Sequence, residues 1–288
     1  MEYTLKCGGM TAVCKDFGAE LVSLKDASGK EYLWQAEPSV WNQHNPVLFP
    51  VVGRTINDTV KIYGKPYNIG LHGFAHKSTF SAIAQREDSV TFELCHNAET
   101  YENYPFEFSL CVTHRVTEKG FVTEFSVTNK GCGNMPFCIG AHPGFNCDGD
   151  FEDWRIVFEK TEDAWAYILN EKACLNEKDR EYTLPETDTL NLKHSIFDRV
   201  DTLHFHDLKS ESVKLLDKND HGICVDFKGF PMLGLWTAVD KAAPYICIEP
   251  WHGCGAFEDE TGELSDKPYC IVLSPKENKK LSYTVTVI

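Results

Sequence analysis

Four ionisable residues lie in short segments next to glycine or proline, where a side chain can be held rigidly for chemistry. Arg54 follows a glycine in NPVLFPVVGRTIND, His72 precedes one in LHGFAHKSTF, His142 precedes Pro-Gly in CIGAHPGFN, and Glu249 ends the apolar run of YICIEPWHG. A carboxylate at the end of a buried strand is costly unless it is paired or has a function. A histidine donates or accepts a proton at cellular pH. Together these residue types suggest proton transfer on a bound polar molecule.

Each motif also has a simpler structural interpretation. Arg54 alone suits a surface arginine at a strand end, and Glu249 alone suits a carboxylate that caps backbone N–H groups. Phe74 and Trp251 are most simply core aromatics, although Phe74 could stack on the face of a sugar ring. The combination favours a site. An arginine delivered by a buried-looking run points into a cleft, where its forked donors bind hydroxyl groups or an anion.

A metal site is the less favoured interpretation of the histidines. His76 follows His72 by four residues, but HGFAH lacks the glutamate of HExxH, and Gly73 is a poor helix residue. We therefore prefer His72, a loop histidine followed by glycine, over His76 as a site residue. His204 and His206 in LHFH alternate on one strand face and are interpreted as ordinary strand residues, with metal binding as the lesser alternative.

Sequence motifs of the common cofactor sites are absent. The chain has no GxGxxG, no P-loop, no GxSxG and no cysteine pair with CxxC spacing. The predicted chemistry therefore needs no cofactor and no metal, only an acid and a base.

The charge and the cysteines narrow the class of protein further. A formal net charge of −15 argues against nucleic acid and anionic membranes as partners, and more weakly against a phosphorylated substrate. The N-terminus lacks the pattern of a signal peptide, and no stretch approaches the roughly 20 apolar residues of a membrane span. Most of the 12 cysteines lie in apolar runs and are interpreted as reduced core residues. A cytoplasmic location is predicted.

Short strands recur along the whole length. In FSLCVTHRV and FVTEFSVTN apolar and polar residues alternate, which is typical of half-buried antiparallel strands, and Glu118-Lys119-Gly120 predicts a hairpin turn between them. FEDWRIVFEK and the region near 170–182 are ambiguous between helix and strand, and residues 184–211 are polar and irregular, as in a long connection. The pattern predicts an all-β protein, one large antiparallel β-sandwich in a single domain over residues 1–288.

Taken in order, VVGR, HGFAH, GAHPGFN and IEPWHG resemble the aldose 1-epimerase (galactose mutarotase) family, including its bacterial mutarotase-like branch. The resemblance runs over most of the chain. It implies a large antiparallel β-sandwich and an isomerase that interconverts the α and β anomers of an aldohexose, a small-molecule partner. Within it, Glu249 matches the catalytic base and His142 the catalytic acid.

The resemblance also implies a set of residues that bind the sugar. Arg54 and His72 match residues that hold the hydroxyl groups and the ring, and the family uses an aspartate for one hydroxyl. Asp201 in FDRVDTLHF is our choice for that aspartate, ahead of Asp198. The predicted substrate-binding set is Arg54, His72, Asp201, Phe74 and Trp251.

Several alternatives stay open at this point. The segment WHG after Glu249-Pro250 departs from the commonest mutarotase ending, so the sugar is open, as is the choice between monomer and homodimer. A hexose-6-phosphate 1-epimerase would need extra positive charge, of which the segments around His72 and Glu249 supply little. A non-catalytic carbohydrate-binding protein would not need a matched acid and base. A glycoside hydrolase, which uses two carboxylates about 5–9.5 Å apart, ranks low because only one carboxylate lies in a site-like motif.

Overall fold

The computed structural model describes all of residues 1–288. Strands dominate it, and its two α-helices, α1 (Ala98–Asn103) and α2 (His194–Val200), fall well short of the length and apolar character of a membrane-spanning segment. The prediction of an all-β antiparallel fold is confirmed. The strands are β1 (Glu2–Cys7), β2 (Met10–Lys15), β3 (Leu21–Lys25), β4 (Val47–Leu48), β5 (Thr59–Ile62), β6 (Lys65–Asn68), β7 (Ser81–Gln85), β8 (Ser89–Cys95), β9 (Phe108–Thr117), β10 (Gly120–Asn129), β11 (Met135–Phe137), β12 (Ile139–Ala141), β13 (Gly144–Asn146), β14 (Arg155–Tyr167), β15 (Arg180–Asn191), β16 (Thr202–His206), β17 (Ser212–Leu216), β18 (Gly222–Asp226), β19 (Met232–Trp236), β20 (Tyr245–His252), β21 (Ile271–Leu273) and β22 (Asn278–Val287).

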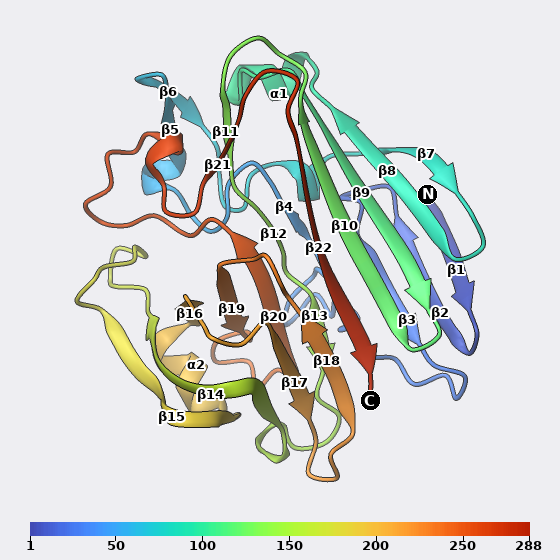
Figure 1. The fold of residues 1–288 in the computed structure, drawn as a ribbon. Helices are drawn as coiled ribbons and strands as arrows, with labels where there is room; N and C mark the ends of the chain where they lie inside the picture. Colours follow the sequence, from blue (N-terminus) through green and yellow to red (C-terminus); the bar gives the residue numbers. More distant parts are fainter.

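One large antiparallel sheet of 15 strands runs through the molecule (Figure 1). Its order is β4-β12-β20-β19-β16-β14-β17-β18-β22-β10-β9-β8-β7, with β13 also paired to β20 and β15 to β14. The sheet therefore joins strands from distant parts of the sequence. In particular, β20 lies between β12 and β19, and β16 lies on the far side of β19.

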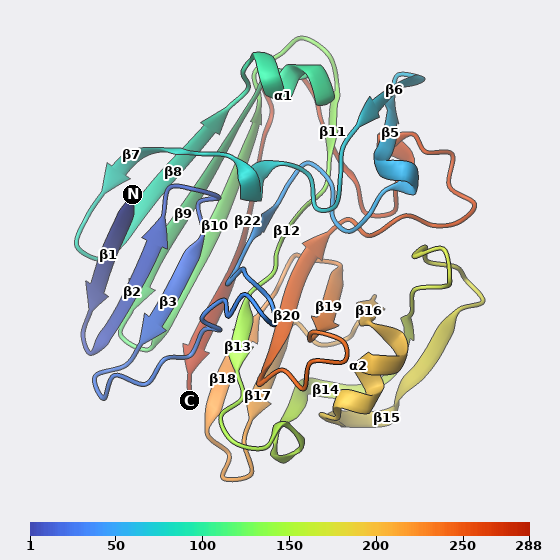
Figure 2. The same cartoon turned by 180° about the vertical axis from the view of Figure 1, so that it is seen from behind.

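A second, three-stranded sheet, β1-β2-β3, packs on β8 and β9 and makes the other layer of a sandwich in this half of the molecule (Figure 2). The alternation predicted for residues 108–129 is present, because β9 and β10 turn every second side chain toward the buried interface. The predicted hairpin is also confirmed, since Thr117 pairs with Gly120 across the two residues Glu118 and Lys119. One continuous apolar cluster extends from Leu5 to Val285 and joins both halves.

The structure resolves one ambiguity left by the sequence and corrects one interpretation. The segment after Trp154 is a strand, β14, and most of the region predicted as an irregular connection is regular: it holds the second half of β15, then α2 and β16. The strand β15 is largely exposed and pairs only with β14, through several register shifts. A strand with so little buried surface shows no strict alternation of apolar residues, which explains the error.

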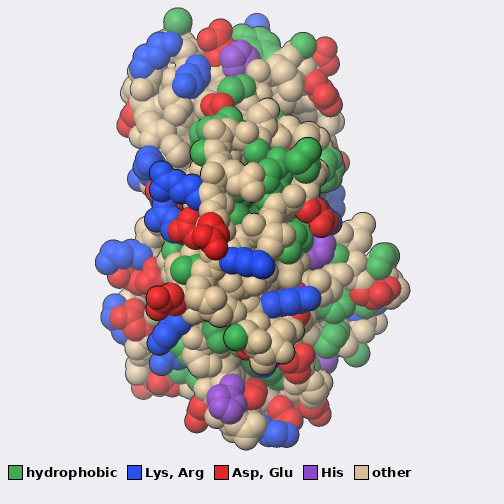
Figure 3. Space-filling model, turned by 90° about the vertical axis from the view of Figure 1, so that its right-hand side faces the viewer, with side chains coloured by type: hydrophobic (Ala, Val, Ile, Leu, Met, Phe, Trp, Pro, Cys, Tyr) green, Lys and Arg blue, Asp and Glu red, His purple; other side chains and the backbone are tan.

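The surface and the cysteines complete the description. Acidic and basic side chains are interspersed over the face shown in Figure 3. All 12 cysteines are free thiols. Cys138 and Cys247 are buried as expected of core residues, whereas Cys95, at the end of β8, is exposed.

Candidate active site

A cavity of about 520 Å³ opens over the face of β16, β19 and β20, with loops from the first third of the chain forming its rim. This volume lies within the range of small-molecule sites, roughly 300–1,000 Å³. The cavity brings together residues from distant parts of the sequence, from Val40 to Gly255. Of the predicted site residues, it is lined by Arg54, His72, His142, Asp201, Glu249 and Trp251.

Glu249 lies in the middle of β20, a strand that is buried along nearly its whole length because it has neighbours on both sides. Its side chain is 1% exposed. Neither carboxylate oxygen accepts a hydrogen bond from the protein. Burial raises the pKa of Glu249 well above its usual value. The nearby indole of Trp251 lowers this pKa in part, although it makes no aligned hydrogen bond, and the charge of Asp201 raises it further. Apart from the imidazole of His142, the carboxylate has no partner in the protein, so both oxygens can accept hydrogen bonds from a bound molecule.

His142 faces this carboxylate. It lies in the short link between β12 and β13, both of which pair with β20, so the link holds the imidazole beside β20. Nε2 of His142 lies 3.2 Å from Oε2 of Glu249. Its ring packs against Trp41 and Trp236, with centroid distances of 5.0 and 5.4 Å, and its Nδ1 has no partner. Burial lowers the pKa of His142 to about 3.

His72 approaches His142 edge-on, with ring centroids 5.4 Å apart. Its Nδ1 accepts a hydrogen bond from the backbone N–H of Gly53 at 3.1 Å, so in the neutral ring the proton is on Nε2. Both His72 and Gly73 have positive φ angles. A side chain at Gly73 would meet the carbonyl of Phe49 at 2.1 Å, so glycine is required for the backbone to turn here. Burial lowers the pKa of His72 well below its usual value.

The two other predicted polar residues lie at the rim. Arg54 is half-exposed and lies 3.7 Å from Asp58, so its guanidinium group remains largely open to the cavity. Asp201 ends helix α2 with a positive φ angle, and its Oδ1 accepts a hydrogen bond from Nε1 of Trp236 at 2.8 Å. Burial raises the pKa of Asp201, and the hydrogen bond from Trp236 opposes this. Asp198 instead accepts a backbone hydrogen bond from Asp240 and does not line the cavity.

Trp251 forms part of the floor. A Cβ atom added to Gly140 would meet the pyrrole edge of its indole at 2.6 Å, and one added to Gly234 would meet the benzene edge at 2.6 Å. The indole therefore lies flat across the sheet over two neighbouring glycines. Nε1 of Trp251 has no hydrogen-bond partner, so it is a further unused donor beside the carboxylate.

Phe74 is the predicted site residue that the structure leaves outside the cavity. Its ring packs against Phe49, Tyr104 and Phe108 at centroid distances of 6.0 to 6.2 Å. Its half-buried ring packs against the edge of the core, so Phe74 does not line the cavity in this structure. The alternative histidine, His76, also does not line the cavity.

Sequence reasoning missed much of the cavity lining, including the polar and aromatic residues Trp41, His204, Trp236 and Lys241. No local motif marks the two tryptophans or the lysine. For His204 the alternation in LHFH indicated one strand face but not which face. Only the pairing of β16 with β19 shows that this face is the floor of the cavity.

One group of three side chains has metal-ligand chemistry. The donor atoms of His142, Cys247 and Glu249 all lie within 4.8 Å of one another. Burial raises the pKa of the Cys247 thiol well above its usual value, and the charge of Glu249 adds to this. A metal bound by Cys247 would require the thiolate, so metal binding here would release the thiol proton.

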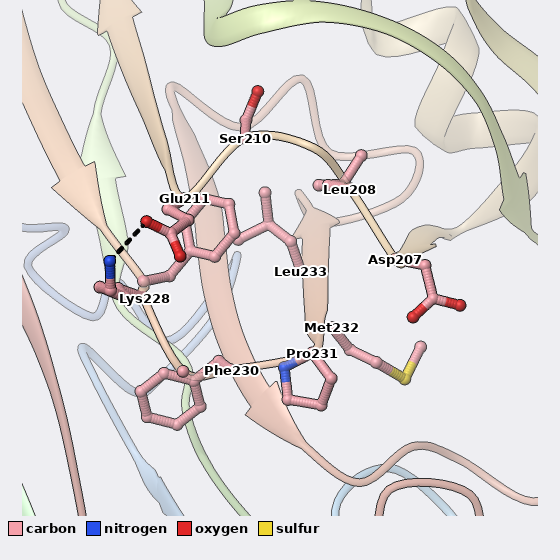
Figure 4. Close-up of a pocket in the computed structure, with 11 residues that line it drawn as sticks. Asp207, Leu208, Ser210, Glu211, Lys228, Phe230, Pro231, Met232 and Leu233 are labelled. Carbon is pink, nitrogen blue, oxygen red and sulfur yellow. Dashed lines mark hydrogen bonds and ion pairs between the residues drawn. The ribbon is translucent and has the colours of Figure 1, made fainter.

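A second, smaller hollow of about 210 Å³ lies between the segments around Leu208 and Phe230 (Figure 4). It contains no histidine, and its Glu211 is paired with Lys228 at 2.9 Å. It therefore offers no unpaired acid–base couple, and the cavity over β20 is the candidate active site.

The sequence and the fold were compared with known proteins. A sequence model of the aldose 1-epimerase family matches residues 1–286. The chain belongs to the aldose 1-epimerase family. Protein LacX (plasmid) of Lactococcus lactis subsp. lactis is 38% identical, and the alignment covers 100% of both chains.

Two solved structures share the fold closely. A galactose mutarotase related enzyme from Lactobacillus acidophilus is 33% identical, with a TM-score of 0.94 over 100% of this chain and 97% of that one. A galactose mutarotase-like protein from Lactobacillus casei ATCC 334 is 30% identical, with a TM-score of 0.94 over 100% of both chains. The resemblance noted in the sequence is thus confirmed at the level of family and fold.

Proposed function

We propose that this protein is an aldose 1-epimerase that interconverts the α and β anomers of an aldohexose without a cofactor. The observation that carries the proposal is the pair at the cavity floor. Glu249, a buried carboxylate with no hydrogen bond, lies 3.2 Å from Nε2 of His142. Family membership implies a sugar substrate and an isomerase, and it supports this interpretation of the pair.

The chemistry requires one proton acceptor and one proton donor. Glu249 removes the proton of the C1 hydroxyl while Nε2 of His142 donates a proton to the ring oxygen. The C1–O5 bond breaks, and the sugar becomes the open-chain aldehyde. Rotation about the C1–C2 bond presents the other face of the carbonyl, and the same two groups act in reverse to close the other anomer. Each positioned group contributes about 10²–10⁴-fold to the rate.

Burial at the cavity floor disfavours the charged forms of both Glu249 and His142. The pKa of Glu249 is raised and that of His142 is lowered to about 3, so the uncharged forms of both are favoured. Ring opening in the direction above uses the carboxylate and the imidazolium. A bound sugar supplies hydroxyl donors to the two free carboxylate oxygens, and such hydrogen bonds stabilise the charged carboxylate.

The remaining residues suit the binding of a pyranose. Nε2–H of His72 and the guanidinium group of Arg54 donate hydrogen bonds, and Asp201 accepts them. The flat indole of Trp251 offers an apolar surface beside the reacting carbon. These roles follow from donor and acceptor chemistry at the cavity wall.

The test is polarimetry of freshly dissolved α-D-glucose and α-D-galactose with wild type and Glu249→Gln. The uncatalysed mutarotation of each sugar is the control. We expect wild type to accelerate at least one sugar and the variant to lose about 10²–10⁴-fold in kcat/KM. No acceleration by wild type with either sugar would remove the proposal for free hexoses. Sugar binding without acceleration would instead support a non-catalytic carbohydrate-binding protein.

A hexose 6-phosphate is the second candidate substrate, and Lys241 is the observation in its favour. This lysine lines the cavity and forms no ion pair, and Arg54 is a second cation on the wall. Comparing free with 6-phosphorylated glucose and galactose, in wild type and Lys241→Met, tests it. A preference for the phosphorylated sugar that disappears in the variant is expected if Lys241 binds the phosphate.

We also propose that the protein works in the cytoplasm. Cys95 and Cys132 are exposed free thiols, which persist in a reducing compartment. Mass spectrometry of alkylated protein from its own cells tests this, since oxidised cysteines would contradict the proposal.

A further inference from the structure

His204 is a buried histidine of the cavity lining with one ring nitrogen already committed. It lies on β16 and is 5% exposed. Its Nδ1 lies 3.3 Å from the carbonyl oxygen of Tyr167 and 3.2 Å from that of Thr202. A carbonyl can only accept, so Nδ1 carries the proton and Nε2 carries the lone pair. Burial lowers the pKa of His204 to about 4, so the ring stays neutral at cellular pH.

Nε2 of His204 is therefore an acceptor of fixed position, and it makes no hydrogen bond to the protein. Its ring lies beside the indole of Trp251, with centroids 5.5 Å apart. A polar atom on a mostly apolar wall is costly unless a bound molecule or water pairs with it. The cavity thus presents an acceptor for one hydroxyl group at this position.

Strand register relates this acceptor to the acid–base pair. His204 pairs with Gly234, and Gly234 pairs with Glu249, so the three residues form a row across β16, β19 and β20. Residues directly opposite each other on paired strands point to the same face of a sheet. Since neighbouring strands are about 4.8 Å apart, the backbones of His204 and Glu249 are about 10 Å apart. Gly234 has no side chain, so nothing but the flat indole lies between them.

The order of the strands also shows on which side of Glu249 each histidine lies. β12, which leads to His142, lies on one side of β20, and β16 lies on the other side. Glu249 is therefore flanked by His142 on one side and by His204 on the other. In a pyranose, C1 is likewise flanked by the ring oxygen on one side and by C2 on the other.

The order His142, Glu249, His204 across the cavity matches the order ring oxygen, C1, C2 in the sugar. With Glu249 at the C1 hydroxyl and His142 at the ring oxygen, we propose that Nε2 of His204 accepts a hydrogen bond from the C2 hydroxyl and makes the enzyme selective for it. The inference rests on the proposed function, because that function sets which atoms face Glu249 and His142. His204 is then a substrate-binding residue that determines specificity, with no part in the proton transfers.

The experiment compares each parent sugar with its 2-deoxy form. The pairs are D-glucose with 2-deoxy-D-glucose, and D-galactose with 2-deoxy-D-galactose. Kinetics are measured for wild type, His204→Phe and His204→Gln. The matched control is His206→Phe: His206 is on the same strand but outside the cavity, where it stacks on Tyr167 at 4.7 Å.

For wild type we expect kcat/KM to be about tenfold lower for the 2-deoxy sugar, the effect of one lost hydrogen bond to a buried acceptor. In His204→Phe, kcat/KM for the parent sugar should fall by a similar factor, mainly because KM rises. The ratio of kcat/KM between the parent and the 2-deoxy sugar should then approach one. His204→Gln should regain part of the selectivity, because its amide oxygen can reach the position of Nε2. His206→Phe should keep the full selectivity for the parent sugar over its 2-deoxy form.

Undiminished selectivity in His204→Phe, or equal loss in His206→Phe, would overturn the inference. Equilibrium binding separates this outcome from failure of the proposed function. Trp41, Trp236 and Trp251 line the cavity, so their fluorescence reports sugar binding without turnover. If wild type accelerates no sugar, weaker binding of the 2-deoxy form to wild type but not to His204→Phe would still support the contact. Equal binding of both forms to wild type would overturn it.

Discussion

Two buried glutamates in different parts of the large sheet have opposite surroundings. Glu162 on β14 is 2% exposed, and its carboxylate accepts hydrogen bonds from the backbone N–H of Lys209, the backbone N–H of Ser210 and the hydroxyl of Ser210 at 2.6 to 3.1 Å. Glu249 on β20 is equally buried and accepts none. The protein therefore satisfies a buried carboxylate where it serves the structure, and leaves one unsatisfied where a ligand is expected.

Two buried histidines repeat the contrast. His114 on β9 has both ring nitrogens engaged, Nδ1 with the hydroxyl of Thr123 at 2.9 Å and Nε2 with the carbonyl of Ala19 at 2.8 Å. His142 has no partner for Nδ1, and its Nε2 faces only Glu249. Burial alone thus does not identify a functional group in this fold. The distinction lies in whether its hydrogen bonds are complete.

The largest expected effect comes from exchanging the histidines one at a time. His142→Gln should lower kcat/KM for mutarotation by about 10²–10⁴-fold, because it removes the proton donor to the ring oxygen. His114→Gln should leave the rate unchanged and lower the melting temperature. Polarimetry and thermal unfolding on both variants check this. Equal loss of rate in the two would contradict the distinction between them.

Glu162→Gln should lower the stability of the fold and leave the reaction rate unchanged, in contrast to His142→Gln. The amide cannot accept the same set of charge-assisted hydrogen bonds, so we expect the free energy of unfolding to fall by about 1–3 kcal/mol with mutarotation unchanged. Denaturant titration measures the change. A variant as stable as wild type would show that the contacts of Glu162 do not stabilise the fold.

The pH dependence of stability should report on the buried carboxylate of Glu249. The folded-state pKa of Glu249 is raised, so the stability associated with its protonated form is present below its unfolded pKa and is lost as pH rises. Each pKa unit of difference is worth about 1.4 kcal/mol. Because the glutamine of Glu249→Gln cannot ionise, the melting temperature of this variant should rise relative to that of wild type as pH increases from about 5 to about 8. A constant difference over this range would count against an unpaired carboxylate.

The smallest effect is expected from metal removal. The Cys247 thiol beside Glu249 and His142 favours its protonated form, and the proposed chemistry uses only protons. Dialysis of the active enzyme against a chelator should therefore leave kcat/KM unchanged. Loss of activity that is restored by a divalent cation would show that these three side chains do hold a metal.

The sequence predicted the features that local patterns encode. The alternation in residues 108–129 indicated half-buried strands because each pleated strand has one buried face. Glycine and proline correctly marked the strand end beside His142, but His72 lies in a turn and Glu249 lies within β20, not at its end. The exposed strand β15 lacked this signal. Trp236 and His204 could not be predicted because they reach the cavity through strand pairing between distant segments, and register is not written in either segment alone.

The indole of Trp251, resting on Gly140 and Gly234, sets the depth of the reaction chamber. A methyl group at either glycine would meet the indole at 2.6 Å, so the ring would have to shift and the cavity would change shape. The space above Glu249 thus depends on two glycines that are not among the residues proposed to transfer protons. Under the proposed function, the size of the sugar and the transfer of protons would be set by different residues.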